Sequence, residues 1–292
     1  MSTLTLFLMT RKGYQLLADT VDTFRDLFAK VVVGRDATLD DDYAEQTIAL
    51  CERHGIAWTE RSQHREINTD YAMAVGWRWM IDFPEDRLIV FHDSLLPRYR
   101  GFNPLVSALI NGDDRVGVTA LLGASEYDAG PILAQASMEV AYPCTIARAI
   151  DDICACYRDA ALAVFPQLAQ GSPLQGVPQD DNAATYSLWR DEEDYRIDWH
   201  GEATRLVRHI DALGSPYAGA RTLVNGTLAR VGRAQALPDV PIENRTPGKV
   251  IRVDNGLPVV VCGRGLLKIT ELTDIASGES LLPLAKFRSR FA

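Results

Sequence analysis

The residue best suited to proton chemistry in this sequence is a histidine at the end of an apolar run. His92 closes residues 87–92, Arg-Leu-Ile-Val-Phe-His, which predict a buried strand of a parallel sheet. Ligands bind such sheets at the carboxyl ends of the strands, and imidazole exchanges a proton near neutral pH. A lone histidine is more often a core residue bonded to a backbone carbonyl. Pro97 and Gly101 favour the functional interpretation, because they predict a rigid loop directly after the strand.

The loop after His92 and a second segment carry specific motifs. Residues 92–101 read His-Asp-Ser-Leu-Leu-Pro-Arg-Tyr-Arg-Gly and resemble the His-x-Ser-Leu-Leu-Pro-x-Tyr-Arg-Gly segment of folate-dependent formyltransferases. Gly117-Val-Thr119 and residues 127–133, Tyr-Asp-Ala-Gly-Pro-Ile-Leu, resemble the same family's Gly-Val-Thr and Asp-x-Gly segments. His92 and Asp128 lie 128 − 92 = 36 positions apart, which matches the interval between the family's catalytic His and Asp. Two motifs at the matching separation make the resemblance specific.

The resemblance implies an N-formyltransferase that moves a formyl group from 10-formyltetrahydrofolate to a primary amine. Attack by the amine creates an oxyanion, and a proton must pass from the attacking nitrogen to the leaving folate nitrogen. By resemblance, His92 orients the amine and donates to the oxyanion or carries the proton. Asp128 then lies against His92 or a bound water and keeps the imidazole chargeable. An aspartate in a glycine-containing turn is otherwise a plain turn former.

One residue expected from the family is missing. The family carries an Asn two positions before its histidine, where this sequence has Val90. Loss of such an oxyanion donor typically costs about 10²–10³ in rate. We hypothesise that Asn103 is a catalytic residue that supplies the donor; its alternative role is an N-cap ahead of Pro104. Two other outcomes stay open: an enzyme that tolerates the loss because its amine is strongly nucleophilic, or a domain that binds without catalysis.

The resemblance also implies a pterin pocket. Backbone near the Trp-Arg-Trp segment and the loop of residues 123–128 would line it. The candidate residues for binding the folate are Trp79, Met80, Ile81, Gly123 and Tyr127. Trp77 and Trp79 have a second interpretation as core residues, since alternate positions of a strand face the same side.

The identity of the amine is a choice among related functions. The Trp-Arg-Trp segment at residues 77–79 is more typical of nucleotide-sugar formyltransferases, so a nucleotide-linked amino sugar is the first expectation. Methionyl-tRNA and a hydroxyornithine-type amine are the alternative acceptors. A hydrolase that releases formate from the folate is a further alternative, and Val90 keeps open a non-catalytic binder of folate or nucleotide.

Charge argues against a nucleic acid as the substrate. The net charge is −9. Residues 1–180 hold 15 Lys and Arg against 25 Asp and Glu, a balance of −10, and residues 181–292 hold 15 against 14, a balance of +1. Proteins that bind polyphosphate chains normally present a basic face, so a small polar substrate fits better. The near-neutral C-terminal part adds to the case for a sugar acceptor.

Cysteine usage and hydropathy argue against other classes. The 5 cysteines are scattered, and Cys154-Ala-Cys156 is spaced more closely than a usual zinc knuckle. We therefore expect neither a disulfide framework nor a metal. No run approaches the roughly 20 apolar residues of a membrane span, and the apolar N-terminal run precedes the first basic residues, unlike a signal peptide. We expect a cytoplasmic protein.

The first 170 residues must build the sheet that positions His92. Apolar runs alternate with helical patterns, which predicts βαβ units in a doubly wound α/β domain with a mostly parallel sheet. The predicted helices cover residues 14–29, 38–54, 103–110 and 145–170. The predicted strands cover residues 4–10, 30–34, 71–77, 87–92, 115–123 and 132–140.

A second, β-rich domain is expected after a change in composition. Residues 171–185 are rich in Gly, Pro, Ser and Asn or Asp and predict a linker. A helix near residues 202–213 and short β runs with two Asn-Gly turns predict a small, barrel-like domain of OB type. Arg196-Ile-Asp-Trp199 resembles the family's junction to that domain. We expect a formyltransferase domain over residues 1–185, linker included, and a β-rich domain over residues 186–292.

Residues 283–291 are apolar and basic. Such a segment either packs on the barrel or forms a contact in a homodimer. The sequence leaves both roles open.

Overall fold

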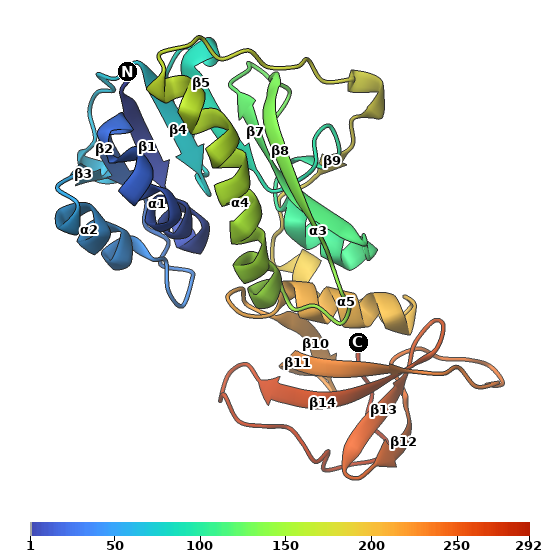
Figure 1. The fold of residues 1–292 in the computed structure, drawn as a ribbon. Helices are drawn as coiled ribbons and strands as arrows, with labels where there is room; N and C mark the ends of the chain where they lie inside the picture. The colour runs from blue at the N-terminus through green and yellow to red at the C-terminus, as the bar shows by residue number, and fades with distance from the viewer. Residues whose placement is uncertain (1) are drawn as a thin grey trace. The chain divides into compact units, whose positions relative to one another are not determined.

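Figure 1 shows the chain as a computed structural model, which describes residues 2–292. The chain divides into two compact units. The first contains Asp114–Val140, Ala149–Leu188 and the described residues up to Leu105, and the second contains Val106–Asp113, Ala141–Arg148 and Trp189–Ala292. The predicted domain boundary after residue 185 stays a prediction.

A seven-stranded sheet forms the centre of the first unit. Its strand order is β3-β2-β1-β4-β5-β7-β8. Neighbours are parallel from β3 to β5, whereas β7 pairs antiparallel with both β5 and β8. The predicted α/β class with a mostly parallel sheet is confirmed. The strands are β1 (Leu4–Leu8), β2 (Phe28–Val33), β3 (Ala57–Glu60), β4 (Tyr71–Val75), β5 (Leu88–His92), β7 (Arg115–Leu122) and β8 (Ile132–Glu139).

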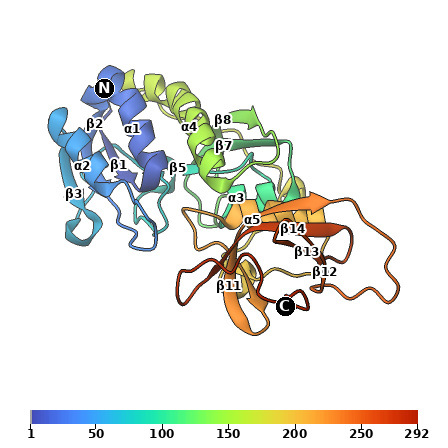
Figure 2. The same ribbon diagram turned by 90° about the horizontal axis from the view of Figure 1, so that it is seen from below.

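The helices α1 and α4 lie on one face of this sheet. A Cβ on Gly13 of α1 would lie 3.1 Å from the Leu8 Cβ, so the helix passes directly over β1. Phe165 of α4 packs edge-on against Phe24 of α1, and the two helices lie side by side in Figure 1 and Figure 2. The helices are α1 (Thr10–Phe24), α2 (Ala44–Arg53), α3 (Pro104–Asn111) and α4 (Ile146–Ala169), and the short 3-10 helices are Arg25–Leu27, Arg61–Gln63, Glu85–Arg87, Asp181–Ala183 and Glu193–Tyr195.

Several elements differ from the sequence expectation. The first helix spans Thr10–Phe24 rather than residues 14–29, and strand β2 begins at Phe28 rather than at residue 30. The second helix begins at Ala44 rather than at residue 38, because the carboxylates of Asp36 and Asp42 accept hydrogen bonds from backbone amides two residues on and hold turns instead. Strand β3 was not predicted. Its residues are partly or fully exposed at the edge of the sheet, so no apolar run marks it.

The segment predicted as a linker is bound along the first unit. Val177 and Ile132 exchange backbone hydrogen bonds of 2.8 Å in both directions. Strand β9 (Tyr186–Ser187) pairs with β6 (Arg100–Gly101) in a short parallel ladder. We call residues 177–187 the strap. Its composition is typical of a linker, and composition does not reveal backbone partners that lie far away in the sequence.

Five antiparallel strands and a helix form most of the second unit. The strand order is β10-β11-β14-β13-β12. Both predicted Asn-Gly turns are present, and Asn225-Gly226 and Asn255-Gly256 have positive φ at each residue, as tight hairpins require. The elements are α5 (Ala203–Leu213), β10 (Ala220–Val224), β11 (Thr227–Leu237), β12 (Val250–Asp254), β13 (Leu257–Val261) and β14 (Leu266–Asp274).

Residues 289–292 join the two edges of this sheet. Leu223 of β10 and Ala292 exchange backbone hydrogen bonds of 2.8 and 2.9 Å, and Arg290 forms a bridge with Lys249, directly before β12. Phe291 is 1% exposed. The segment gives the sheet a barrel-like closure and packs on it, which is one of the two roles considered from the sequence.

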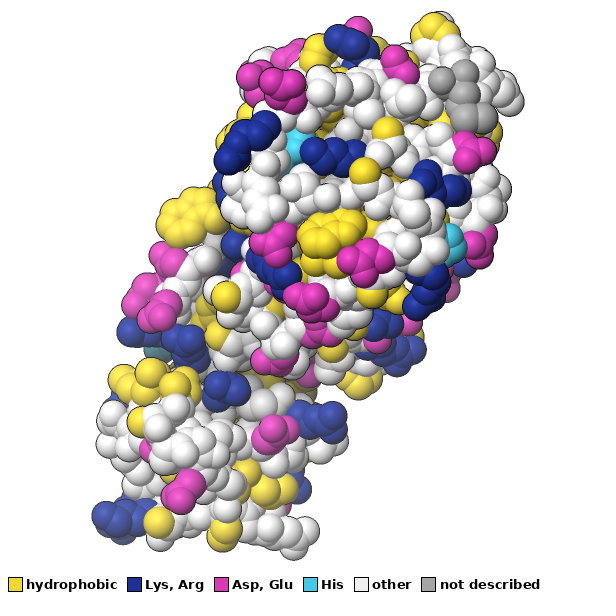
Figure 3. Space-filling view, turned by 90° about the vertical axis from the view of Figure 1, so that its left-hand side faces the viewer, with side chains coloured by type: hydrophobic (Ala, Val, Ile, Leu, Met, Phe, Trp, Pro, Cys, Tyr) yellow, Lys and Arg dark blue, Asp and Glu magenta, His cyan; other side chains and the backbone are white. Residues whose placement is uncertain are grey.

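The surface carries charges of both signs. On the face shown in Figure 3, Lys and Arg side chains are interspersed with Asp and Glu side chains. Across residues 2–292, no helix combines the length and the apolar character that crossing a membrane requires.

Candidate active site

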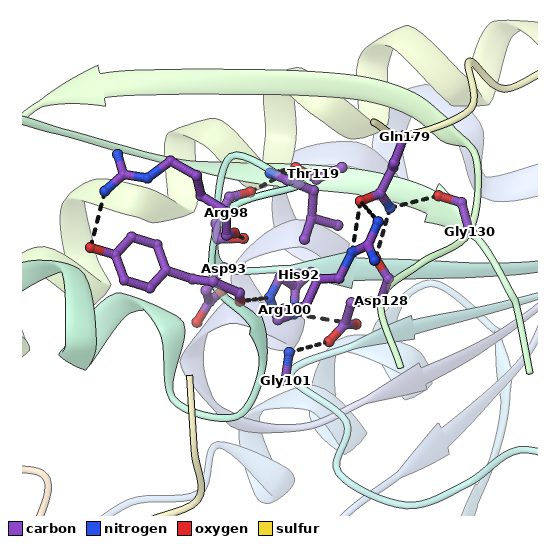
Figure 4. A network of polar contacts seen from close by, with 12 residues as sticks. His92, Asp93, Arg98, Arg100, Gly101, Thr119, Asp128, Gly130 and Gln179 are labelled. Atoms are coloured by element: carbon purple, nitrogen blue, oxygen red, sulfur yellow. Dashed lines mark hydrogen bonds and ion pairs between the residues drawn. The ribbon is translucent and has the colours of Figure 1, made fainter. Parts of the chain in front are cut away.

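His92 and Asp128 meet at the carboxyl end of β5. The ring nitrogen Nδ1 of His92 lies 3.4 Å from Oδ1 of Asp128, and Figure 4 shows the two side chains pointing toward each other. The side chains are 8% and 14% exposed. The fold therefore brings together the two residues that the motifs singled out, in a place largely shielded from bulk water.

The other ring nitrogen of His92 is fixed by the loop that follows β5. Nε2 lies 2.8 Å from the carbonyl oxygen of Tyr99. Because a carbonyl only accepts, Nε2 must carry the hydrogen. The backbone contact typical of a core histidine is thus present, yet it leaves Nδ1 free to exchange a proton beside Asp128.

Asp128 is held in an uncommon backbone conformation. Its φ is 56°, in the left-handed region that residues other than glycine rarely adopt. Its Oδ2 accepts a hydrogen bond of 2.8 Å from the amide of Gly101. Two residues on, a Cβ at Gly130 would lie 1.8 Å from the Leu122 carbonyl oxygen. Close packing therefore fixes the loop, and the loop directs the carboxylate at His92.

A buried ion pair lies directly after His92. The carboxylate of Asp93 contacts Lys12 of α1 and Tyr157 of α4. Burial raises the pKa of Asp93, but the charge of Lys12 and the hydrogen bonds from Lys12 and Tyr157 outweigh it, so the pKa lies below its ordinary value. Sequence reasoning missed this cluster, because its members come from three distant segments that share no motif.

An aliphatic side chain occupies the position of the missing family asparagine. Val90 pairs in register with Ala74 of β4 and Leu121 of β7. It lies two residues before His92, so both side chains are on the same side of β5. The strand therefore supplies no side-chain amide beside the histidine to donate to an oxyanion.

Asn103, the proposed substitute, directly precedes α3 with a φ of 48°. An N-cap normally has extended backbone, so the residue does not have ordinary N-cap geometry. Within residues 2–292, its side chain is not hydrogen-bonded to His92 or Asp128. Its part in catalysis stays a proposal.

The tryptophans of the expected pterin region are packed. Trp77 lies edge-on against Phe7, with 5.1 Å between ring centroids, and against Trp79, with 5.0 Å. The guanidinium groups of Arg61 and Arg78 lie 4.1 and 4.9 Å from the Trp79 ring centroid. Trp77 is thus a core residue on the face of the sheet opposite α1, and Trp79 is a packing partner of two arginines.

The other candidates for the pterin pocket differ in exposure. Ile81 packs in the apolar cluster around Trp77, whereas Met80 is 78% exposed. Gly123 donates its amide hydrogen at 2.7 Å to the carbonyl at the start of β5. Tyr127 is 65% exposed and lies 5.9 Å, between ring centroids, from Phe102. Contact of these residues with a folate stays a prediction.

Thiols and metal ligands do not gather at this site. Among residues 2–292, no three His, Cys, Asp or Glu side chains are arranged to hold a metal ion. All five cysteines are buried free thiols. Burial raises the pKa of Cys154 and of Cys156 to about 11, so thiolates are scarce at neutral pH.

Comparison with known families matches two segments of the chain. The model described as "Formyl transferase" covers residues 60–155, which include His92 and Asp128. The model described as "Formyl transferase, C-terminal domain" covers residues 190–282. A methionyl-tRNA formyltransferase of Methylococcus capsulatus is 33% identical over 193 residues, which are 66% of this chain and 61% of that protein. The chain spans about three-fifths of the length of the curated relatives it matches.

Solved structures share the fold. An N-formyltransferase from Helicobacter canadensis superposes with a TM-score of 0.71 over 92% of this chain and 99% of that chain, at 13% identity. HypX from Aquifex aeolicus superposes with a TM-score of 0.61 over 96% of this chain and 47% of that chain, at 20% identity. At such identities the likeness concerns the fold.

Proposed function

The chain belongs to the formyl transferase family, and we propose that it transfers a formyl group from 10-formyltetrahydrofolate to the primary amine of a nucleotide-linked sugar. The observation that carries the proposal is the His92–Asp128 pair, 3.4 Å apart at the end of β5. The folate donor is supported by the Helicobacter canadensis structure, which was solved with folinic acid and dTDP-3-aminofucose.

The proposed reaction forms one bond and breaks one bond at the formyl carbon. The neutral amine attacks this carbon, and the carbonyl oxygen becomes the oxyanion of a tetrahedral intermediate. Collapse of the intermediate breaks the bond to N10 of the folate. One proton leaves the attacking nitrogen and one is taken up by N10, so the products are a formamide and tetrahydrofolate.

His92 suits the proton step. With the hydrogen of the neutral ring on Nε2, the lone pair is on Nδ1 and accepts the proton of the attacking amine. The carboxylate of Asp128, 3.4 Å from the same nitrogen, stabilises the imidazolium that forms by its opposite charge. Nδ1 then returns the proton to N10. The oxyanion needs a separate donor, for which Asn103 remains our hypothesis.

A small nucleotide-linked amine is the acceptor that fits best. The Helicobacter canadensis protein with the same fold binds an amino sugar linked to dTDP. The interspersed charges of the face in Figure 3 are unlike the basic field of a protein that grips a polynucleotide. We propose a cytoplasmic location on the same grounds, since the donor and acceptor are both small intracellular metabolites.

Methionyl-tRNA is the second candidate acceptor. It is favoured by the curated relative of Methylococcus capsulatus, a methionyl-tRNA formyltransferase that is 33% identical to this chain over the matched segment. The same His92–Asp128 chemistry serves either amine, so the choice lies with the surface around the site.

Mass spectrometry of the products tests both acceptors. The purified chain is incubated with 10-formyltetrahydrofolate and either dTDP-linked amino sugars or methionyl-tRNA, with His92→Ala as the control. We expect formylated sugar from the unaltered chain and a large loss with the variant. Formylation of methionyl-tRNA alone would establish the second candidate, and formylation of neither, with tetrahydrofolate and free formate accumulating, would show a hydrolase.

A further inference from the structure

We propose that Gln179 of the strap is a positioning residue that holds Asp128 beside His92. The inference rests on the proposed function, because it concerns the carboxylate that would stabilise the His92 imidazolium. Gln179 lies in a segment with the composition of a linker, and it acts through the backbone of the Asp128 loop rather than through the carboxylate.

The side-chain amide of Gln179 is bonded to both sides of the turn at Asp128. Its Nε2 donates to the carbonyl oxygens of Asp128 and Gly130, each at 2.7 Å, as Figure 4 shows. These two hydrogen bonds use both amide hydrogens. One side chain therefore spans the turn and fixes the carbonyl of Asp128 itself.

Arg100 determines which way this amide faces. Its Nε and one terminal nitrogen donate to Oε1 of Gln179 at 3.1 and 2.9 Å. A guanidinium only donates, so the amide oxygen must face Arg100 and the amide nitrogen must face the loop. The Arg100 side chain is 3% exposed and also pairs with Asp181 at 2.8 Å. The orientation of Gln179 is thus set by a buried charge.

Strand β6 also contacts the side chain of Asp128. Gly101, the residue after Arg100, donates its amide hydrogen to Oδ2 of Asp128. Asp128 is therefore held at its carbonyl by Gln179 and at its carboxylate by Gly101. Both contacts depend on β6, the strand that pairs with the strap, because Arg100 orients Gln179 and Gly101 donates to the carboxylate directly.

The strap is anchored on both sides of Gln179. Before it, Val177 is paired with Ile132 of β8. After it, the amide of Arg100 donates to the carbonyl of Thr185 at 2.8 Å, and the amide of Tyr99 donates to the Thr185 hydroxyl at 2.9 Å. The carbonyl of Tyr99 in turn accepts from His92. The strap thus binds the backbone that follows Asp128, at Ile132, and the backbone that follows His92, at Tyr99.

Asp128 needs such support because of its backbone. Left-handed conformations of residues other than glycine persist only where the surroundings over-determine them, and Asp128 has a φ of 56°. Without the amide of Gln179 the loop is free to relax, and the carboxylate moves relative to His92. A misplacement of about 1 Å can cost about 10² in rate.

Steady-state kinetics on the full chain test the first consequence. Gln179→Leu removes all four contacts, and Gln179→Glu keeps an acceptor for Arg100 but removes the donors to the loop. We expect both to lower kcat by about 10- to 100-fold with little change in KM for the folate donor. The matched control is Gln175→Leu. Gln175 is an exposed glutamine of the predicted linker, before the strap, and this variant should retain full activity. Full activity of Gln179→Glu would overturn the proposal.

A double variant separates positioning from a general structural role. If Gln179 acts through Asp128, adding Gln179→Leu to Asp128→Asn should cost no further activity. A purely structural role predicts the same fold-loss in both backgrounds. That second result would overturn the proposal.

Hydrogen exchange gives a readout that does not depend on turnover. In the unaltered chain the Gly101 amide is protected by Asp128 Oδ2, and we expect its exchange to accelerate at least about ten-fold in Gln179→Leu, with core amides of β1 unchanged. Unchanged protection of Gly101 would overturn the proposal. If no amine is formylated by the unaltered chain, the proposed function fails, and the exchange result still decides whether Gln179 holds Asp128.

Discussion

Tyr157 of α4 donates its hydroxyl hydrogen to the carboxylate of Asp93, the residue directly after His92. Lys12 of α1 contacts the other oxygen of the same carboxylate. Two helices that lie side by side are therefore tied to the start of the loop that carries the site. The Tyr157 ring also stacks on Phe91, with 5.8 Å between centroids, so the contact joins the polar cluster to the apolar core.

Removing either partner of Asp93 should destabilise the first unit. Tyr157→Phe keeps the stacked ring and removes one donor to a buried carboxylate, which costs about 1–3 kcal/mol. Lys12→Met leaves the charge unpaired and costs about 3–5 kcal/mol. Equilibrium unfolding in urea measures both. A Tyr157→Phe chain that loses more stability than Lys12→Met would contradict this assignment.

The same carboxylate makes stability depend on acid. The pKa of Asp93 is lower in the folded chain than its ordinary value, so its stabilisation is fully present above about pH 4, the pKa of an unfolded aspartate. It is lost as the pH falls through the lower, folded pKa. We expect the free energy of unfolding to fall more steeply in acid for the unaltered chain than for Asp93→Asn. An equal fall of the free energy of unfolding with pH in the two chains would contradict this prediction.

His92 and Asp128 should carry formyl transfer together. His92→Ala removes the group that takes the proton, and we expect a loss of about 10²–10⁴ in kcat/KM. Asp128→Asn keeps the size of the side chain and removes the charge, so it should be impaired while remaining folded. Product formation and urea unfolding are measured on the same preparations. Near-normal turnover by the His92 variant would refute the mechanism.

The oxyanion donor is tested by a pair of variants. If Asn103 replaces the amide that Val90 lacks, Asn103→Ala should lower turnover by about 10²–10³. Val90→Asn in the Asn103→Ala background should then restore part of the activity. Unchanged turnover by Asn103→Ala rules the compensation out.

His209 of α5 should titrate far below neutrality. Burial lowers its pKa to about 4, and Arg190 adds to the shift. The pKa of an unfolded histidine is about 6.5. The stability of the folded chain with a neutral His209 is therefore fully present above about pH 6.5, and part of it is lost as the pH falls toward about 4. The loss over this window is roughly 3 kcal/mol. NMR titration of the ring checks the pKa, and a midpoint near 6.5 would contradict it.

The strand that carries His92 was predictable, because a run of apolar residues records burial on both sides of a sheet. The approach of Asp128 was predictable from the resemblance of its segment to a family motif, at the family's interval from the histidine. The Asn-Gly turns of the second unit were also predictable, since positive φ at two successive residues restricts the residue types. For the strand and the turns, the information lies within a few neighbouring residues.

The contacts that hold the pair were not predictable. Lys12 lies in α1, Asp93 directly follows β5, and Tyr157 lies in α4. Nothing in their local sequence marks a common partner. Gln179 lies in a segment whose composition predicts a linker, and composition does not reveal backbone partners that lie far away in the sequence. Such features depend on which distant segments the fold places side by side.

The closure of the second unit by residues 289–292 has a practical consequence. Deleting these four residues would leave β10 and the start of β12 with unpaired amides and carbonyls, and would strip Phe291 from beneath Trp199. Bare strand edges beside a newly opened apolar surface recruit other chains. A shortened chain should therefore aggregate in solution, even though every residue proposed for the reaction is still present.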